Sequence, residues 1–368
     1  MADEEDLVAL RDGARRVLAD ACQSPSLHAF WDGASGLERS LWKTAAELGW
    51  LAAGLPEDDG GLGLGLPALN VLHQEFGRHV APGPFIASLA AGQWLAQVLP
   101  PEKRVDFLPA LAAGEISLGA PAVLDGSETL AVRGSALSGR VRVLGWSDCA
   151  LAIVPVGAGG RIESWALIQP QDVATLTPID NWDRSRSVCQ LDCRAAAPLA
   201  LIPDPSGALS RGLLRQLVLA VAADSVGAAQ GVAEKTVEYM KTRVQFEKPI
   251  GSFQALKHRA ADLHIKIASN ERLLAQAVNT AAAEHPDADL WAALAKAGAT
   301  EAAAFVAGDC VQLHGGIGHT WSYDCHMFLK RARFNEALLC NNRRLRDLAA
   351  EDLAEAVRSG RSPLELPE

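Results

Sequence analysis

Apolar residues recur at helical spacing along the first third of the chain. Between residues 6 and 114 they repeat every three or four positions, as in Leu7, Leu10 and Ala14. This spacing places the apolar side chains on one face of a helix. We therefore predict an N-terminal helical domain over residues 1–115. Further segments with the same spacing lie at residues 41–51, 67–76 and 84–99.

The pattern changes between residues 116 and 206. Short runs rich in β-branched residues are separated there by glycine, aspartate, asparagine and proline, which favour turns. We therefore predict a compact central β domain, a barrel or a sandwich of six to eight strands. The runs that predict strands are residues 117–123, 129–133, 140–144, 150–154, 164–168 and 188–193.

Helical spacing returns over residues 207–368. Long periodic segments joined by short connections are typical of an antiparallel bundle. We predict four helices, of which the last has a break near Phe334–Asn335. The predicted fold class is thus α+β multidomain, with an N-terminal helical domain, a central β-barrel-like domain and a C-terminal four-helix bundle. The four predicted helices cover residues 209–246, 253–284, 286–313 and 323–358.

Composition and charge restrict the classes of partner. The chain has 368 residues, 49% of them hydrophobic, and a formal net charge of −10, which argues against nucleic acid as the main partner. The longest apolar stretch, Leu213–Ala233, contains Arg215 and Asp224, so we expect a buried helix and no membrane span. The N-terminal residues are acidic and no apolar segment follows them, so we expect no secretory signal.

The cysteines suggest neither disulfides nor a metal site. There are seven of them, an odd number, and they are scattered along the chain. Only Cys189 and Cys193 are close, at a spacing that suits neither a redox CxxC motif nor a zinc site. We expect buried free thiols in a cytoplasmic protein without a metal.

Two polar segments interrupt the predicted bundle helices. Residues 243–254 combine an arginine, an amide and an aromatic ring at a helix end, and Pro249 and Gly251 then form a corner. Residues 311–321 form a second, glycine-rich interruption. A cation, an amide and a ring at one helix end can contact a phosphate-bearing aromatic ligand. Two such interruptions on one scaffold suggest a single ligand site.

Three motifs resemble the acyl-CoA dehydrogenase family from end to end. They are the Leu41–Gly61 pattern, the sequence Arg243-Val-Gln-Phe-Glu-Lys-Pro-Ile-Gly-Ser-Phe-Gln254, and Gln312-Leu-His-Gly-Gly-Ile-Gly-His-Thr-Trp321. The resemblance implies an enzyme that oxidises acyl-CoA thioesters at Cα–Cβ with FAD and passes electrons to an electron-transfer flavoprotein or a similar acceptor. A carboxylate must then take the α-proton while the flavin accepts the β-hydride.

In this family FAD lies between two subunits. The β domain of one subunit holds the flavin ring, and the helical domain of its neighbour holds the pyrophosphate and adenosine. Each matching residue also has a simpler interpretation: Arg243 as a helix cap, Phe246 as core, and Gly315–Gly316 as a helix stop. The residues that match the second role are Arg243, Gln245, Phe246, Gln254, Gln312, Gly315 and Gly316.

The flavin-ring contacts of the family are missing from the predicted β domain. Residues 118–127 contain no Thr-Glu-Pro triplet. The Trp-Ile-Thr triplet that stacks on the flavin in the family falls on Val143-Leu144-Gly145, with Trp146 nearby. A small alignment gap would make Trp146 the stacking ring.

The catalytic base is missing as well. The two family positions for this glutamate fall on Leu339 and Leu217. Two weak candidates remain. Glu336 lies about one helical turn before Leu339, and Asp224 lies two turns after Leu217 on the same helix face. The favoured interpretation of Asp224 is a structural partner for an arginine or lysine of a neighbouring helix, or a partly solvated position, because an unpaired buried carboxylate is costly.

These departures lead to three hypotheses. The first is a base-deficient subunit of a heterotetramer that completes the FAD site of a second acyl-CoA dehydrogenase-like subunit, as in bacterial family members that often act on bulky substrates such as steroid side chains. The second is a self-sufficient homotetrameric dehydrogenase with Asp224 or Glu336 as base. The third is a non-redox acyl-CoA binding or lyase protein that has lost FAD.

Overall fold

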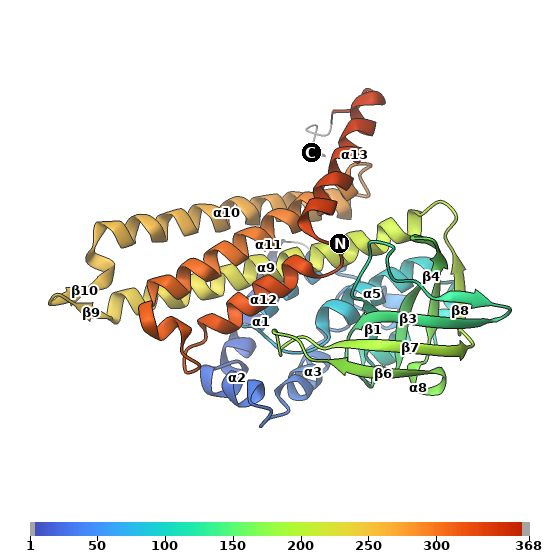
Figure 1. Cartoon of the computed structure of the whole chain (residues 1–368), viewed down its shortest axis with the longest axis horizontal. Coiled ribbons are helices and arrows are strands. Elements are labelled where there is room, and N and C mark those ends of the chain that lie inside the picture. The colour runs from blue at the N-terminus through green and yellow to red at the C-terminus, as the bar shows by residue number, and fades with distance from the viewer. Residues whose placement is uncertain (1–3, 363–368) are drawn as a thin grey trace.

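The helices and strands follow the predicted order of helices, sheet and helices (Figure 1). The computed structural model describes residues 4–362, and their side chains except those of residues 172–174. The N-terminal elements are α1 (Glu4–Ala21), α2 (Ser24–Trp31), α3 (Leu37–Glu47), η1 (Glu57–Asp59), α4 (Gly65–Arg78), α5 (Phe85–Val98), α6 (Pro101–Arg104) and α7 (Leu108–Ala112).

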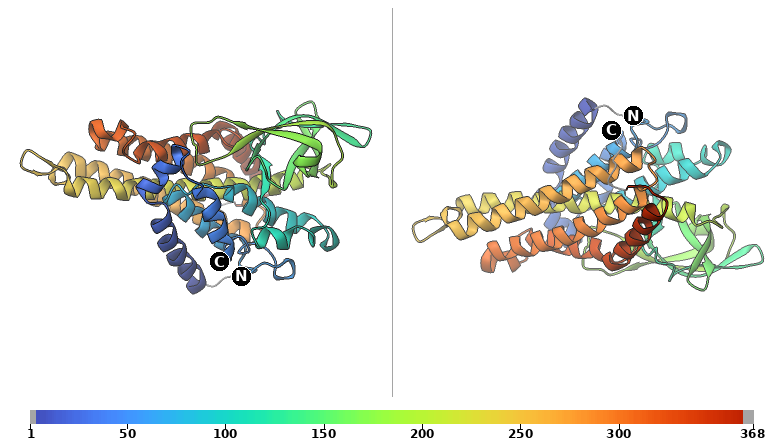
Figure 2. Two further views of the ribbon diagram at one scale, coloured as in Figure 1. Left: turned by 90° about the horizontal axis from the view of Figure 1, so that it is seen from below. Right: turned by 90° about the horizontal axis from the view of Figure 1, so that it is seen from above.

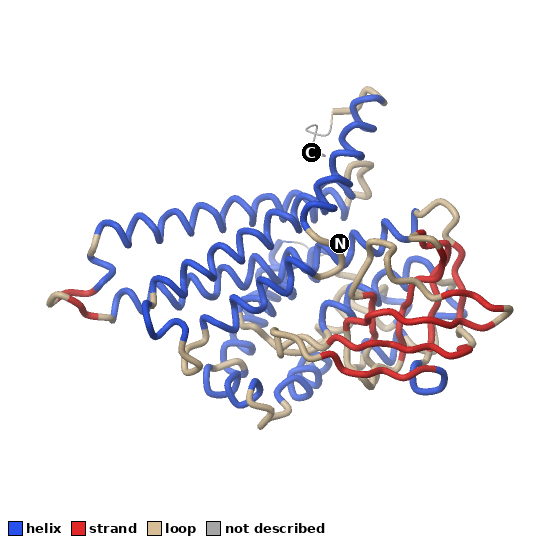
Figure 3. The backbone as a smooth tube through the Cα atoms, in the orientation of Figure 1, coloured by secondary structure: helices blue, strands red, loops and turns tan. Residues whose placement is uncertain are grey.

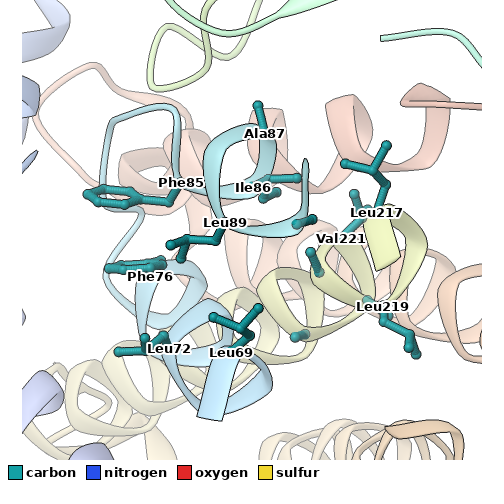
Figure 4. Close-up of a cluster of buried hydrophobic side chains, with 14 of the residues drawn as sticks. Leu69, Leu72, Phe76, Phe85, Ile86, Ala87, Leu89, Leu217, Leu219 and Val221 are labelled. Carbon is teal, nitrogen blue, oxygen red and sulfur yellow. The ribbon is translucent and has the colours of Figure 1, made fainter. Parts of the chain in front are cut away.

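The main core lies where α4 and α5 meet α9 (Ala208–Thr242), as the close-up in Figure 4 shows. Phe76 of α4 and Phe85 of α5 stack there, with ring centroids 4.1 Å apart and planes 13° apart. Both rings are 1% exposed or less, so they remove a large apolar area from water. This packing joins the N-terminal helices to the C-terminal bundle.

Two glycines let α4 and α9 pack with their backbones in contact. A Cβ atom on Gly227 would lie 1.8 Å from the carbonyl oxygen of Gln74, and one on Gly77 would lie 1.9 Å from that of Asp224. No real side chain fits at such distances, so these positions require glycine. Their spacing fixes how closely the bundle sits against the N-terminal domain.

The central unit is an eight-stranded sheet folded around its own apolar core (Figure 3). The strand order is β6-β7-β3-β1-β4-β5-β8, with β2 paired to β3, and all pairs are antiparallel except β1 with β4. The sequence pattern missed β6 and β8. The elements are β1 (Leu118–Pro121), β2 (Ala131–Arg133), β3 (Ala136–Leu144), β4 (Leu151–Ala158), β5 (Arg161–Ile168), α8 (Pro170–Val173), β6 (Ala174–Ile179), β7 (Val188–Ala196) and β8 (Ala200–Pro203).

The C-terminal unit holds long antiparallel helices (Figures 1 and 2). The connections α9–α10 and α11–α12 lie at the end of the bundle that is far from the sheet, and α13 turns away from the other helices. The remaining elements are β9 (Val244–Gln245), β10 (Lys248–Pro249), η2 (Ile250–Ser252), α10 (Gln254–Ala282), α11 (Ala288–Leu313), η3 (Gly315–His319), α12 (Cys325–Ala337) and α13 (Asn342–Arg358).

The predicted break in the last helix is misplaced. The chain leaves helical geometry after Ala337, not near Phe334–Asn335, and α13 begins at Asn342. Leu339 adopts a positive φ of 71°, which an α-helix cannot contain. The bundle therefore contains α9 to α12, and α13 is a separate, fifth helix.

Burial explains both the apolar helix and the cysteines. By length and hydropathy α9 is the one helix among the described residues that could cross a membrane, but 83% of its most apolar window is buried inside the molecule. Such burial is typical of a helix in the core of a protein, and α9 is therefore a core helix. All seven cysteines are free and buried, and burial raises the pKa of Cys22 and Cys325 to about 12.

Candidate functional site

The two interrupting motifs lie side by side at the far end of the bundle. The ring of Tyr239, in the last turn of α9, stacks on His314 with centroids 4.3 Å apart and planes 17° apart. The Tyr239 hydroxyl also donates a hydrogen bond to the His314 carbonyl (3.4 Å), and the Arg243 amide donates to the Tyr239 carbonyl (2.8 Å). Arg243 and Gly315 are therefore anchored to the same tyrosine.

The first motif forms a short hairpin that projects from the bundle. Strands β9 and β10 pair antiparallel, and the turn residues Phe246 and Glu247 have φ values of 53° and 65°. Positive φ at both central positions is the geometry of a tight hairpin turn. Phe246 is 86% exposed, so it is not a core residue. Its ring contacts Phe253 edge-on, with centroids 6.2 Å apart.

Arg243 combines a structural role with an available charge. Its backbone caps the C-terminus of α9, which the simpler sequence interpretation anticipated. Its side chain is exposed and, among residues 4–362, forms no ion pair or hydrogen bond. The guanidinium is thus free to bind an anion, and guanidinium groups bind phosphate oxygens with strong charge-assisted hydrogen bonds.

The second motif exposes backbone that no side chain covers. Gln312, Gly315 and Gly316 are exposed at the α11–η3 junction, and Gly315 has a φ of 64°. A Cβ atom on Gly315 or Gly316 would meet no other group within 4 Å, so the space beside them is open. Gly318 has a different function, because its Cβ would lie 2.4 Å from the Val311 carbonyl oxygen and it must be small for the turn to close.

All seven residues that match the cofactor-binding role are exposed at this one end of the bundle. They supply a free cation, amide side chains, an exposed ring and unobstructed backbone, and we name them the adenosine clamp. This donor set fits a pyrophosphate with an attached nucleoside. The members are Arg243, Gln245, Phe246, Gln254, Gln312, Gly315 and Gly316.

The flavin-ring region of this chain is closed. The segment after β1, where the family carries its flavin-ring loop, bonds directly to Leu339, the expected position of the base. The Leu339 amide donates to the Ala122 carbonyl (2.9 Å), and the Leu124 amide donates to the Leu339 carbonyl (2.7 Å). Leu339 is 1% exposed. These two hydrogen-bonded backbone segments leave no space between them in this chain.

A buried lysine holds this closed segment. Nζ of Lys296, on α11, donates to the carbonyls of Glu336 (2.9 Å) and Cys340 (3.0 Å) and to Oδ1 of Asn342 (3.2 Å). Burial lowers the pKa of Lys296 to about 8. These bonds satisfy the carbonyls at the end of α12 and fix the chain where it turns into α13. We did not anticipate this role from the sequence, although a lone lysine in an apolar helical run is the visible signal.

Asp224 lies in a buried ion-pair network rather than in a cleft. The carboxylate is 0% exposed, and it accepts hydrogen bonds from Arg186, from Arg331 (2.9 Å) and from Asn335 (2.9 Å). Arg331 also binds Asp183 (2.9 Å). Burial alone would raise the pKa of Asp224, but Arg186 and Arg331 hold it below its usual value. The geometry therefore favours the structural interpretation of Asp224.

Glu336 and Trp146 are also engaged within the chain. The half-buried Glu336 side chain pairs with Arg333 of the same helix at 2.7 Å. Trp146 is 6% exposed; it contacts Trp42 edge-on, and the Arg39 guanidinium lies 3.6 Å from its ring centroid. Trp146 thus packs beneath α3 and offers little surface for stacking on a flavin.

Metal chemistry finds no support in the described part of the chain. Among residues 4–362, no group of three or more histidine, cysteine, aspartate or glutamate side chains is placed to hold a metal ion. The candidate chemistry therefore rests on the adenosine clamp and on the state of the flavin-ring region.

Comparisons with known proteins connect these features to one family. The acyl-CoA dehydrogenase N-terminal domain matches residues 4–115, and the C-terminal domain matches residues 211–354. The acyl-CoA dehydrogenase IpdE2 of Mycobacterium tuberculosis is 33% identical over 353 residues, which cover 95% of this chain and 98% of IpdE2.

Two solved structures are similar over nearly the whole chain. A variant of the Tcur3481–Tcur3483 steroid ACAD is 29% identical, with a TM-score of 0.87, and the match covers 96% of this chain and 99% of that one. The ChsE4–ChsE5 complex from Mycobacterium tuberculosis is 23% identical, with a TM-score of 0.83 and coverage of 100% and 99%. The second likeness is one of fold.

Proposed function

Because the chain belongs to the acyl-CoA dehydrogenase family, we propose that it is the base-deficient subunit of a heterotetramer and completes the FAD site of its partner. The enzyme class, an oxidoreductase acting on acyl-CoA, follows from the family. The division of labour between two kinds of subunit is our proposal. Its central support is the contrast between an open adenosine clamp and a closed flavin-ring region.

The closed region supports the absence of a complete site in this chain. Leu339 supplies no carboxylate, and its backbone bonds to Ala122 and Leu124, in the segment that the family resemblance assigns to the flavin-ring loop. Lys296 holds that arrangement through three hydrogen bonds. Opening the region would expose Leu339 and break buried backbone bonds, which is unfavourable. We therefore assign neither the base nor the ring contacts to this subunit.

The open clamp supports a role toward a partner. FAD, when bound, supplies the hydride acceptor. Arg243 would neutralise pyrophosphate charge, Gln245, Gln254 and Gln312 would donate hydrogen bonds, and Phe246 would cover the nucleoside. The backbone at Gly315–Gly316 would approach the phosphates closely, since no side chain intervenes there. Every one of these residues is exposed in this chain.

The relatives suggest the assembly and the substrate class. ChsE4–ChsE5 is a complex of two named components, and the Tcur3481–Tcur3483 enzyme is a steroid ACAD. We propose by analogy a second acyl-CoA dehydrogenase-like subunit, a bulky steroid-derived acyl-CoA as substrate and an electron-transfer flavoprotein as acceptor. We also propose that the enzyme works in the cytoplasm, in line with its seven free cysteines.

A self-sufficient homotetramer is the second candidate, and it requires a base within this chain. Asp224 is fully buried and already accepts three hydrogen bonds, and Glu336 is paired with Arg333. Asp224 is therefore not free to reach a substrate, and Glu336 would first have to leave its pair with Arg333. A non-redox acyl-CoA binding or lyase protein would need no flavin, and the open adenosine clamp gives that third candidate no support.

Purification with and without the partner tests the proposal. The chain is produced alone and together with a candidate partner, an acyl-CoA dehydrogenase-like chain that carries a carboxylate base, and acyl-CoA oxidation is followed with an artificial electron acceptor. We expect activity only from the co-purified pair. Full activity from this chain alone would reject the proposal in favour of the homotetramer, and acyl-CoA binding without flavin or partner would favour the non-redox alternative.

A further inference from the structure

A cluster of aromatic and cationic side chains lies where three parts of the chain meet. Trp31 comes from α2, Arg184 from the loop between β6 and β7, Trp321 from the segment after η3, and His326 and Lys330 from α12. We name these five residues the Trp321 cluster. Trp321 is 43% exposed. Trp182, two residues before Arg184, is 77% exposed.

The cluster is ordered by ring contacts. Trp321 stacks on His326 with centroids 4.8 Å apart and planes 17° apart, and it meets Trp31 edge-on at 6.3 Å. The Lys330 ammonium lies 5.0 Å from the Trp321 centroid and 5.1 Å from that of Trp31. The Arg184 guanidinium lies 5.8 Å from Trp321 and donates a hydrogen bond to the Trp31 carbonyl. The rings and the cations thus form one connected surface, which we also call the shelf.

The shelf carries positive charge that no carboxylate neutralises by direct contact. Neither Arg184 nor Lys330 forms an ion pair with any carboxylate between residues 4 and 362. The nearby Asp183 is bound by Arg331, and Asp324 is bound by Lys235, Ser24 and His28. Burial, and then the charge of Arg184, lowers the pKa of Lys330. An anion beside these two cations would relieve their mutual repulsion.

Two hydrogen-bonding groups in the cluster have no partner in the described structure. They are the indole Nε1 of Trp31, a side chain that is 1% exposed, and Nδ1 of His326. His326 donates from Nε2 to the Trp321 carbonyl (3.3 Å), so its Nδ1 is an acceptor and the Trp31 indole N–H is the unpaired donor. Together with the two cations that no carboxylate contacts, this donor favours an oxygen-bearing anionic group supplied by another molecule.

The location of the shelf identifies that molecule as a protein. Trp321 follows the Gly315–Gly316 part of the adenosine clamp by five residues, so the shelf and the clamp share a continuous surface segment. Exposed tryptophan and arginine are the residues most enriched in energetically dominant interface positions. Two cations on a chain of net charge −10 are too few for nucleic acid.

We propose that the Trp321 cluster, together with Trp182, is the docking surface for a carboxylate-bearing segment of the partner subunit. This inference rests on the proposed heteromeric function. In the complex a partner carboxylate lies against Arg184 and Lys330, and an apolar side chain of the partner covers Trp182 and Trp321. The charge of the shelf thereby selects a partner whose matching surface is acidic.

Charge reversal tests the docking surface. The double variant Arg184→Glu and Lys330→Glu is titrated against the isolated partner subunit over a range of salt concentrations. We expect affinity to fall on the order of tenfold or more at low salt, with the difference shrinking at high salt. Matched controls are Lys103→Glu and Arg133→Glu, exposed cations of α6 and β2, which should bind like the unmodified chain.

A second variant separates docking from folding. Trp182→Ala removes a ring that projects into solvent, so the melting temperature should stay unchanged while affinity falls on the order of tenfold. Unchanged affinity for both variants at all salt concentrations would overturn the docking surface while leaving the heteromer intact. A chain that binds FAD and oxidises acyl-CoA alone would overturn the proposed function and the inference together, and self-association through Trp182 would overturn the inference.

Discussion

At the scale of single residues, some charged side chains of this chain are paired with an opposite charge and others have no partner among the described residues. Arg331 and Asp224 are buried in mutual contact, whereas Arg243 has no partner side chain among the described residues. A buried pair is held because removal of one member leaves the other uncompensated. An exposed, unpaired arginine has no such structural reason. Its charge is available for a ligand.

Arg243→Ala should weaken FAD binding by the assembled enzyme without unfolding the chain. Loss of a charge-assisted hydrogen bond to phosphate costs about 2 kcal/mol, roughly a thirtyfold loss of affinity. Flavin fluorescence during titration of the apoenzyme measures this affinity. Lys241→Ala, which removes a nearby cation paired with Glu238, is the matched control and should bind FAD normally.

Asp224→Asn should destabilise the protein rather than abolish the chemistry. Loss of this charge leaves Arg186 and Arg331 short of a counter-ion in the core, at a cost of about 3 to 5 kcal/mol. Denaturant titration measures the change. A fully folded variant whose turnover falls by several decades would instead assign Asp224 the role of base and restore the homotetramer hypothesis.

Lys296 should make stability depend on alkaline pH. Its pKa is about 8 in the folded chain and 10.5 as the ordinary value, so between these values the unfolded state holds more protons. The Lys296 contribution to the free energy of unfolding therefore rises with pH in this window, by roughly 3 kcal/mol in total. The difference between the unmodified chain and Lys296→Met should grow accordingly in denaturant titrations from pH 8 to 10.5. A difference that stays constant or falls would contradict the assignment.

At the scale of elements, close packing of α4 and α9 depends on glycine. Gly227→Ala would drive a methyl group into the Gln74 carbonyl and should cost about 1 to 3 kcal/mol, seen as a lower melting temperature. Gly308→Ala on α11 is the matched control. A Cβ there meets nothing within 4 Å, so it should stabilise the helix by about 0.5 to 1 kcal/mol. Equal effects of the two substitutions would contradict the packing argument.

The elements also show how far sequence patterns reach. Sequence patterns located the long helices, because α10 has an apolar face and because α9 and α11 are long, largely apolar segments that are buried on most sides. They missed β6 and β8, short strands whose position depends on pairing with β7 and β5. They also misplaced the end of α12, because that end is set by Lys296, which contacts it from a distant helix.

The candidate site also has one part that the sequence could suggest and one part that only the folded structure shows. The residues of the adenosine clamp lie within two short segments, so a motif could propose them, and their role in binding FAD stays a prediction. The closed flavin-ring region could not be foreseen, because Ala122 and Leu339 lie far apart in sequence and meet only in the folded chain. The Asp224 network likewise joins α9 to Arg186 of the loop before β7 and to Arg331 and Asn335 of α12. Non-local contacts of this kind leave no periodic trace.

At the scale of the whole molecule, our proposal makes the chain one half of a shared site. The sheet and the bundle retain the arrangement of the family, as the TM-score of 0.87 to the Tcur3481–Tcur3483 enzyme indicates. Within that frame one surface, the adenosine clamp, stays open while the flavin-ring region is closed. In our proposal the chain becomes active only with a partner subunit that supplies the flavin-ring contacts and the catalytic base.

The ratio of FAD to protein chains in the purified enzyme tests this account most directly. The assembled complex is resolved by native mass spectrometry, and its flavin is quantified by absorbance after denaturation. We predict one FAD for each pair of unlike subunits and none retained by this chain alone. One FAD for every chain, or stoichiometric FAD on this chain in the absence of a partner, would contradict the account.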